Sequence, residues 1–455
     1  MKEIAIILEN IRDHIWGAPL LFFLLGTGIY LTFILRGVQF RYLFYAFKQV
    51  FAPQKENSKG DINPFEALMT SLAGAIGTGT IVGVATAIMI GGLGAIFWMW
   101  VTALISMATK YAESLLAVKY REVDGRGEMS GGPMQYMEKG LNWKSLACVF
   151  AVLGMIAALT TGNLVQANSI ADAVKHVWNI DARITGIILC VLTGAVVLGG
   201  VKSIGHVAGV LVPLMALIYI GAALFILIIN IHLIPNAIAI IINNAWHGQA
   251  AVGGFFGASM IVSLQMGVAR SVFSNEAGLG ISSVAAAAAK TDSPARQALV
   301  TMTGALISTI IVCTMTGLVL AISGLIGTFD QEGQILNGAA LAIAAFNQHI
   351  WGGEYLVTVG LILFAYTTVL AWSFYGEKCC EYLFGEKSII IYRCLFALVV
   401  IPGSVLQMKT VWELADISNG LMIIPNLIAL ICLSGVVAKE TKSFLSTVEN
   451  EKKGA

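Results

Sequence analysis

Long apolar stretches separated by short polar ones run through almost the whole chain. Each is near twenty residues, enough for a helix to cross a hydrocarbon core of about 30 Å while satisfying its own backbone hydrogen bonds. The stretches are continuously apolar, whereas a membrane barrel would need strands that alternate between apolar and polar residues. We therefore predict an all-α polytopic membrane protein with eleven transmembrane helices, at about residues 16–35, 64–87, 92–117, 145–168, 184–199, 207–230, 253–276, 297–326, 352–376, 389–406 and 416–437.

Glycines interrupt two of these predicted helices. The second contains LAGAIGTGTIVGVA at 72–85, and the seventh contains GGFFGASMIVSLQMGVARSVFSNEAGLG at 253–280. Glycine in a helix interior costs about 1 kcal/mol relative to alanine, and a break at membrane depth exposes N–H and C=O groups that lipid cannot satisfy. We expect helices 2 and 7 to be discontinuous, although glycines can also serve close helix packing.

The positions of the two interrupted helices suggest an internal repeat. With the first helix set aside, ten remain as two sets of five, and an interrupted helix opens each set. An odd number per set makes the second set inverted, and such pairs indicate a transporter site near the bilayer midplane. We expect one transmembrane domain over 1–455, with an extra helix and loop at 1–62, repeats at 63–231 and 250–438, and a tail at 439–455.

Composition agrees with a membrane protein. Hydrophobic residues make up 57% of the chain and charged residues 12%, far from the mix of a soluble domain. The seven cysteines have neither metal-ligand spacing nor a paired extracellular pattern, so we assign them to packing. The amino terminus carries Glu3, Glu9 and Asp13 and lacks a cleavage pattern, so we expect the first helix to be retained.

Positive charge predicts the orientation, because Lys and Arg accumulate in cytoplasmic loops. An exterior N-terminus and a cytoplasmic C-terminus in the cell membrane place all but five of the 27 Lys and Arg on the cytoplasmic side. The five exceptions are Lys2, Arg12, Lys175, Arg183 and Lys409.

Five motifs resemble the alanine or glycine:cation symporter family. They are GTGT at 77–80 after Ile76, FWMWVTAL at 97–104, MATKYAE at 107–113, GEMSGGP at 127–133 and FSNEAGLG at 273–280. The resemblance extends from about residue 15 to 437. It implies the LeuT-type fold of five plus five helices with one additional N-terminal helix, and cation-coupled transport of amino acids.

The break in helix 2 is suited to an amino acid carboxylate. Amides at the start of its second half are unpaired and lie at the positive end of a helix dipole, so Thr78, Gly79 and Thr80 are candidate ligands. Glycine lets the anion approach the backbone without a Cβ in the way. Many members of the family carry asparagine after GTG, so Thr80 puts the contact at that position, and the substrate preference, in doubt.

Further substrate contacts are predicted on helices 4, 7 and 9. Gln166 resembles a family contact to the ammonium, with a helix-to-helix hydrogen bond as the alternative. Trp372, one turn beyond Thr368, shares its face and is a candidate pocket wall, with ordinary aromatic packing as the alternative. Because helix 7 must face helix 2, we add four weaker candidates, Met260, Ser263, Gln265 and Phe273.

A sodium site is implied by the resemblance to sodium-coupled members of this fold. It would use carbonyls of Ala73 and Ile76 together with oxygens of Phe364, Thr367 and Thr368. A threonine in a membrane helix also often bonds to the carbonyl four residues earlier, which is the alternative here. Sodium is the coupling ion in this prediction, and no cofactor is expected.

Acidic residues near the membrane raise a separate question. An intramembrane carboxylate is by default a functional hypothesis, including proton coupling. Glu66, Glu113 and Glu276 lie near expected helix ends, so we expect structural pairs, Lys110 with Glu113 and Arg270 with Glu276. Glu276 is assigned a structural or gating role.

These patterns predict a sodium-coupled symporter that imports small neutral amino acids by alternating access. An uncoupled or proton-coupled permease is the nearest alternative. A membrane enzyme or receptor is disfavoured, because the six histidines are scattered toward loops and no catalytic constellation is apparent. The expected partners are the amino acid, sodium and the lipid bilayer, with no nucleic acid. The preferred amino acid, its enantiomer and the oligomeric state stay open.

Overall fold

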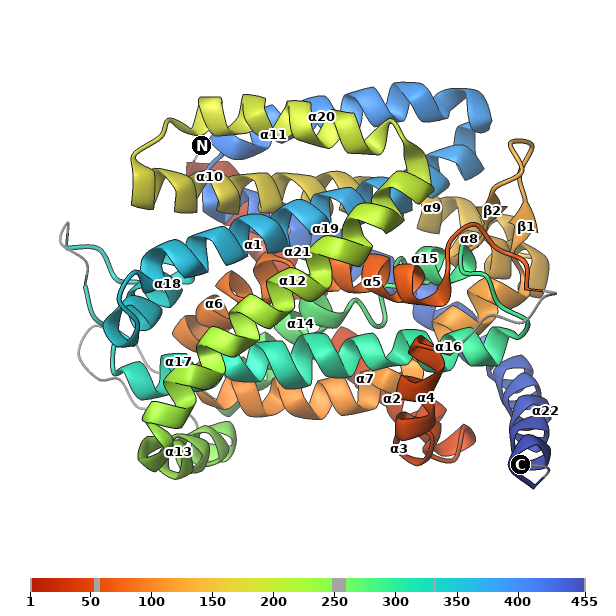
Figure 1. Ribbon diagram of the computed structural model, residues 1–455, viewed down its shortest axis with the longest axis horizontal. Coiled ribbons are helices and arrows are strands. Elements are labelled where there is room, and N and C mark those ends of the chain that lie inside the picture. The colour runs from red at the N-terminus through yellow and green to blue at the C-terminus, as the bar shows by residue number, and fades with distance from the viewer. Residues whose placement is uncertain (1, 53–57, 248–258, 330–332, 454–455) are drawn as a thin grey trace.

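The computed structural model describes residues 2–52, 58–247, 259–329 and 333–453, and these are almost entirely helical (Figure 1). The α-helices are α1 (Lys2–Ile15), α2 (Ala18–Ile34), α3 (Val38–Arg41), α4 (Leu43–Val50), α5 (Pro64–Ala75), α6 (Val82–Gly91), α7 (Gly94–Lys119), α8 (Pro133–Gln135), α9 (Lys144–Leu159), α10 (Val165–Trp178), α11 (Ala182–Val197), α12 (Gly200–Ile229), α13 (Ile234–His247), α14 (Met260–Asn275), α15 (Ser283–Ala287), α16 (Pro294–Ala305), α17 (Thr314–Ser323), α18 (Gly338–His349), α19 (Gly353–Phe384), α20 (Ile389–Val405), α21 (Met408–Cys432) and α22 (Ser434–Lys453).

The remaining elements are short. A hairpin pairs β1 (Glu122–Val123) with β2 (Met129–Ser130) in antiparallel register. Single 3₁₀ turns lie at Thr78–Thr80, Ile231–Leu233 and Glu386–Ser388, and π-helical stretches at Tyr136–Gly140, Thr160–Leu164 and Leu306–Cys313. Two of the π stretches join α9 to α10 and α16 to α17, so each of these pairs forms one continuous path. Such bulges often occur at functional sites.

Eight helical segments within the described residues are long and apolar enough to cross a membrane. They are Ile7–Ile34, Gly94–Lys119, Lys144–Trp178, Gly200–Ile229, Pro294–Ser323, Gly353–Phe384, Glu386–Val405 and Met408–Cys432. Val82–Gly91 and Ala182–Val197 are shorter apolar helices. A multi-pass arrangement follows. The total of eleven crossings stays a prediction, and its segment 253–258 lies outside the described residues.

Several helices differ from the predicted boundaries. The α12 helix begins at Gly200, α19 continues to Phe384, and α21 begins at Met408. In each case the added turns are more polar than a hydrocarbon core allows, and helical structure continues past the apolar part. The sequence prediction also missed α13, α18 and α22, which are too short or too polar to register as spans.

The two interrupted helices lie at the centre of the bundle. Figure 1 shows α5, α6 and α14 between a layer that contains α10, α11 and α20 and a layer that contains α7 and α16. The α5 helix packs against α12 and α19, and α14 packs against α6 and α7. Backbone that leaves helical geometry here is therefore surrounded by protein, as membrane depth requires.

The entry into α5 is set by a capping box. The Asn63 side chain accepts from the Glu66 N–H at 2.8 Å, and the Glu66 carboxylate accepts from the Asn63 N–H at 3.0 Å. Pro64 at the first helical position needs no donor partner. Glu66 therefore has the structural role expected of a carboxylate near a helix end.

Candidate functional site

The first site element is the break between α5 and α6. The α5 helix ends where the Ile76 N–H donates to the Leu72 carbonyl at 2.6 Å. Hydrogen bonding resumes only in the next turn, where the Thr80 N–H donates to the Gly77 carbonyl at 3.2 Å. Helix starts leave their first amides without partners inside the helix. The predicted interruption of this helix is confirmed, and its residues are fully buried.

Gln166 contacts the 3₁₀ turn Thr78–Thr80, where the helix resumes after the break. Its Oε1 accepts from the Thr78 N–H at 3.2 Å, and its Nε2 donates to the Thr161 carbonyl at 3.0 Å. The amide oxygen of Gln166 thus occupies a position where a carboxylate oxygen could accept the same hydrogen bond. The buried Thr78 hydroxyl has no hydrogen-bond partner. An unpaired buried hydroxyl is costly, and a ligand bound at this turn would give it a partner.

The α19 helix brings oxygen atoms to the other side of the break. The Thr368 hydroxyl lies 2.7 Å from the Ala73 carbonyl oxygen and 2.9 Å from the Phe364 carbonyl oxygen. The second contact is the local bond to the carbonyl four positions earlier, which was the alternative interpretation, and the role of Thr368 as an ion ligand stays a prediction. Gly77 is required here, because a Cβ at that position would collide with the Thr368 hydroxyl. Three oxygens from two helices thus converge, which is chemistry suited to a hard cation.

Thr367 is placed differently from its neighbour. Its hydroxyl donates to the Phe364 carbonyl at 3.0 Å and lies 3.6 Å from the Met215 sulfur on α12. Adjacent residues on a helix point in different directions. The cluster at the break therefore contains the hydroxyl of Thr368, while that of Thr367 faces α12.

An aromatic residue covers the break on the α14 side. Phe273 packs so closely on Gly79 that a Cβ there would collide with its ring, and Phe273 stacks on Trp412 with centroids 4.9 Å apart. Arg270 lies over the Trp412 ring at 4.7 Å and bonds both carboxylate oxygens of Asp416, at 3.1 and 2.7 Å. The sequence prediction that Arg270 pairs with Glu276 is wrong, because α21 supplies a bidentate partner.

Trp372 forms a second wall. It packs on Gly162 in the π-helical stretch, where any Cβ would collide with the tryptophan side chain. Its Nε1 points to the Gly74 carbonyl at 3.4 Å. The predicted wall residue is thus beside the break, held between α5 and α9–α10.

Three of the weaker candidates are not brought to the break. The Ser263 hydroxyl donates to the Gly91 carbonyl at the far end of α6. Gln265 donates to the Trp16 carbonyl at 3.0 Å, and Met260 is 38% exposed. Ser263 and Gln265 join α14 to α6 and to the N-terminal segment, whereas Phe273, about two to three turns further along α14, reaches the break.

A second break separates α14 from α15. Glu276, Gly278 and Gly280 there have φ values of +59°, +92° and +76°. Glu113 on α7 accepts from the amides of Gly278 and Gly280 at 2.8 and 3.1 Å, while Lys110 donates to the Asn275 carbonyl at 2.5 Å. Asn426 on α21 also donates to Glu113, at 2.7 Å. The predicted interruption of helix 7 is confirmed in this part.

The expected pairing of Lys110 with Glu113 takes another form. Each side chain satisfies backbone groups of the second break instead of forming a direct salt bridge with the other. Glu276 is fully buried and neither carboxylate oxygen has a hydrogen-bond partner. Its Oε1 would lie 2.7 Å from a Cβ at Gly74, so the two breaks adjoin at this point.

Thr316, Thr161 and Asn419 make contacts around the break and were not among the predicted site residues. Thr316 donates to the Thr80 carbonyl at 2.8 Å, and Thr80 itself donates to the Gly77 carbonyl at 2.9 Å. Thr161 donates to Asn419 at 3.0 Å, which ties the π-helical stretch to α21. Thr316 and Thr161 have partners more than 200 residues away in the sequence, so local patterns could not reveal these contacts. The one local signal was Gly162 in TTGNL, which makes room for Trp372.

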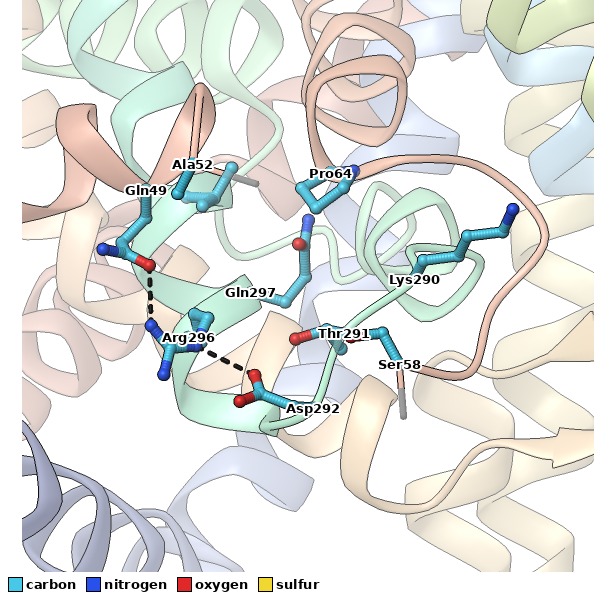
Figure 2. Close-up of a pocket in the computed structure, with 10 residues that line it drawn as sticks. Gln49, Ala52, Ser58, Pro64, Lys290, Thr291, Asp292, Arg296 and Gln297 are labelled. Atoms are coloured by element: carbon cyan, nitrogen blue, oxygen red, sulfur yellow. Dashed lines mark hydrogen bonds and ion pairs between the residues drawn. The ribbon is translucent and has the colours of Figure 1, made fainter. Parts of the chain in front are cut away.

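A small cavity elsewhere is unrelated to the breaks. Figure 2 shows this cavity of about 40 Å³, where Arg296 donates to Gln49 at 2.7 Å and to Asp292 at 2.9 Å. Its lining residues come from α4, the start of α5, the start of α16 and the segments that lead into α5 and α16. None of them lies at either break, so we assign the site to the breaks and not to this cavity.

The fold, with its two discontinuous helices, is that of a polytopic membrane transporter. The chain belongs to the sodium:alanine symporter family, whose model matches residues 1–455. It is a transporter and not an enzyme, in a family of cation-coupled amino acid carriers.

Relatives and a solved structure agree with this membership. The chain is 52% identical to the sodium/alanine symporter AgcS of Methanococcus maripaludis, over 99% of both chains. It is 37% identical to the probable sodium/glutamine symporter GlnT of Bacillus subtilis, over 96% of this chain and 91% of that one. The structure of MhsT in complex with L-phenylalanine matches with a TM-score of 0.59 at 14% identity, covering 82% of this chain and 89% of that chain. This match shows the LeuT-type fold.

Proposed function

We propose that the chain is a sodium-coupled symporter that imports small neutral amino acids, with the α5–α6 break as the shared site for substrate and ion. The observation that carries the proposal is the position of Thr368, whose hydroxyl lies 2.7 Å from the Ala73 carbonyl on one side of the break. On the other side, the Thr78 amide is held only by a side-chain oxygen. A cation and an anion can therefore be bound a few residues apart along the same segment of backbone.

The substrate carboxylate would be received by the amides of Thr78 and Gly79, and by that of Thr80 once it gives up its bond to the Gly77 carbonyl. It displaces the Gln166 oxygen from the Thr78 amide, and the freed Gln166 oxygen then becomes an acceptor for the ammonium. The unpartnered Thr78 hydroxyl gains a partner in the same step. This exchange favours a zwitterion as the ligand, because its carboxylate accepts from the Thr78 amide while its ammonium donates to the Gln166 oxygen.

The size of the substrate is limited by the two aromatic walls. Phe273 is in contact with Gly79 and Trp372 with Gly162, in each case without room for one added carbon. We expect these rings to border the substrate side chain and to disfavour bulky ones. We therefore place alanine and glycine first, and the printed names of the relatives, sodium/alanine and sodium/glutamine, agree with neutral amino acids.

The sodium ion would take the carbonyls of Ala73, Ile76 and Phe364 and the Thr368 hydroxyl. The hydroxyl, which now donates, turns its lone pair to the ion when sodium enters. Thr367 can join only if its hydroxyl rotates away from Met215. A tenfold sodium gradient supplies about 1.4 kcal/mol and a potential of 100 mV about 2.3 kcal/mol per charge. One sodium ion per substrate can thus sustain roughly 500-fold accumulation.

Alternating access would use the predicted topology. In this proposal eleven crossings comprise an N-terminal helix (within 1–62), two inverted five-helix repeats (63–231 and 250–438) and a cytoplasmic tail (439–455), with the N-terminus outside. The two breaks open corresponding positions of the two repeats, and rocking of one repeat against the other would expose the site to each side in turn.

Proton coupling is the second candidate, and one observation favours it. Glu276 is a buried carboxylate with no hydrogen-bond partner for either oxygen, next to Gly74 in the first break. A buried carboxylate without hydrogen bonds is costly even with the Lys110 ammonium nearby, so a proton on this group would reduce that cost.

Uptake of labelled alanine into proteoliposomes tests the two candidates together. We expect accumulation with an inward sodium gradient at equal pH on both sides, and none with an inward proton gradient in sodium-free buffer. Accumulation driven by the proton gradient alone would move the function to the second candidate. Equal uptake with and without a sodium gradient would leave facilitated diffusion.

A further inference from the structure

A cavity of about 390 Å³ opens at the end of α2, beside α22. Figure 1 shows α3, α4 and α22 at the same edge of the molecule. The lining residues come from the α2–α3 junction and from α22: Ile34, Leu35, Arg36, Arg41, Tyr42, Ala438, Thr441, Lys442, Leu445 and Ser446. None of them belongs to the breaks, so the cavity is separate from the transport site.

The charge of the cavity is entirely positive. Arg36, Arg41 and Lys442 line it and no acidic residue does. Among the described residues, none of these three side chains has an ion-pair partner within 4.0 Å, whereas Lys119 and Lys409 are both paired with glutamates. Three unpaired cations around one hollow repel one another, and an anion between them removes that repulsion.

Arg36 occupies an unusual backbone position. Its φ of +54° is in the left-handed region and is followed by Gly37 at +65°. The Gly37 N–H closes the end of α2 on the Thr32 carbonyl at 2.8 Å. Glycine or asparagine is the normal choice in this conformation, and an arginine there is held at a cost. In this turn the position is taken by Arg36, which places a guanidinium group at the end of the membrane-spanning α2.

Exposed aromatic side chains flank the cavity. Phe33, Phe40 and Phe44 are 79%, 55% and 85% exposed. Phe33 belongs to the last turn of α2, whereas Phe40 and Phe44 lie on α3 and α4, which follow directly. Short helices with exposed aromatic rings next to cations are typical of the membrane interface. Exposed aromatic rings and cations at the end of a membrane-spanning helix are the features expected of a site at the boundary of hydrocarbon and headgroup layers.

We propose that this cavity binds the phosphate headgroup of an anionic phospholipid. Arg36, Arg41 and Lys442 contact the phosphate, and the acyl chains follow α2 past Phe33. The volume suits a headgroup of this kind, and basic pockets between helices at the cytoplasmic side are suited to such lipids. A free phosphate ion would use the same cations but would leave the exposed phenylalanines without a role.

The whole chain in neutral detergent, titrated with phosphatidylglycerol and observed by native mass spectrometry, tests the proposal. We expect one retained phosphatidylglycerol at concentrations where phosphatidylethanolamine is not retained. The variant Arg36→Gln/Arg41→Gln/Lys442→Gln should lose it, and each single variant should weaken retention roughly fivefold. The matched control Lys48→Gln/Lys387→Gln/Lys439→Gln removes three exposed cations outside the cavity and should retain the lipid.

Three results would overturn the proposal. They are equal retention of the two lipids, equal loss in the control variant, and displacement of phosphatidylglycerol by inorganic phosphate at equal concentration. The last result would mean a free phosphate site. Thermal unfolding of every variant in lipid-free detergent checks folding, and the single variants replace the triple variant if it does not fold.

Discussion

At the scale of single residues, the site is made by glycines as much as by polar groups. Gly77, Gly79 and Gly162 each sit where a Cβ would collide with Thr368, Phe273 and Trp372 respectively. Each contact brings a ligand or wall residue closer to the backbone than any other amino acid allows. The close contacts at the break therefore depend on the absence of a Cβ at these three glycines.

Thr368→Val tests the ion site at this scale. Valine keeps the shape but removes the hydroxyl that lies 2.7 Å from the Ala73 carbonyl. We expect the sodium concentration for half-maximal alanine uptake to rise about tenfold, which corresponds to about 1.4 kcal/mol. Uptake by proteoliposomes at a series of sodium concentrations measures it.

Thr367→Val is the matched control, since its hydroxyl faces Met215 one residue away. We expect its sodium dependence to change less than threefold. An unchanged value for Thr368→Val, or equal effects of both variants, would place the ion elsewhere.

At the scale of elements, the two breaks are stabilised differently. The α5–α6 break is held by groups that a substrate can replace, such as the Gln166 oxygen on the Thr78 amide. The α14–α15 break is held by charged side chains, with Glu113 on two of its amides and Lys110 on a carbonyl. We infer that the first break receives the ligand and that the second is a fixed support.

The hairpin between α7 and α8 is fastened to the end of α19 by a buried ion pair. Lys378 donates to Asp124 at 3.1 Å and to Glu381 at 2.9 Å. Burial by itself would raise the pKa of Asp124. The Glu128 N–H and the Lys378 ammonium outweigh burial, and the pKa of Asp124 is lowered overall.

This lowered pKa predicts a pH-dependent contribution to stability. A group with a depressed folded-state pKa stabilises the fold above its unfolded pKa, about 4 for aspartate, and loses that contribution as pH falls through the folded value. Asp124→Asn should therefore lower the melting temperature at pH 7, and the gap to wild type should begin to narrow below about pH 4 and close as pH falls through the lowered pKa of Asp124. Thermal unfolding in detergent at pH 7, 5 and 3 measures the gap.

The double variant Asp124→Asn/Lys378→Met provides the control for that experiment. If the two groups act as a pair, the double variant loses less than the two single variants combined. A gap that stays constant down to pH 3 would show that Asp124 contributes through packing instead of charge.

Much of the element-scale structure could be predicted because it depends on local signals. The glycines of residues 72–85 locate the first break to within a few residues, and Asn63–Glu66 marks the start of α5. Arg270 could not be assigned correctly, because Asp416 is far away in sequence and Glu276 is near. The same holds for Ser263 and Gln265, whose partners on α6 and at Trp16 follow from helix rotation, which glycine patterns do not determine.

At the scale of the whole molecule, the same helix bundle must both enclose the break and open it to solvent. Closed contacts such as Arg270–Asp416 and Lys378–Asp124 hold the bundle around a buried break. Transport requires the buried break to become accessible, and we expect contacts close to it, such as Arg270–Asp416 beside Phe273, to rearrange during the cycle. The ligands bias that equilibrium only if they bind one arrangement better than another.

The shared site leads to the most direct test, binding of labelled alanine to the purified protein at several sodium concentrations. If substrate and ion meet at one break, sodium raises alanine affinity, alanine raises sodium affinity by the same factor, and we expect that factor to be about tenfold or more. Scintillation proximity counting of alanine and of radioactive sodium gives both values. Alanine affinity that is the same in sodium and in choline buffer would contradict the central claim.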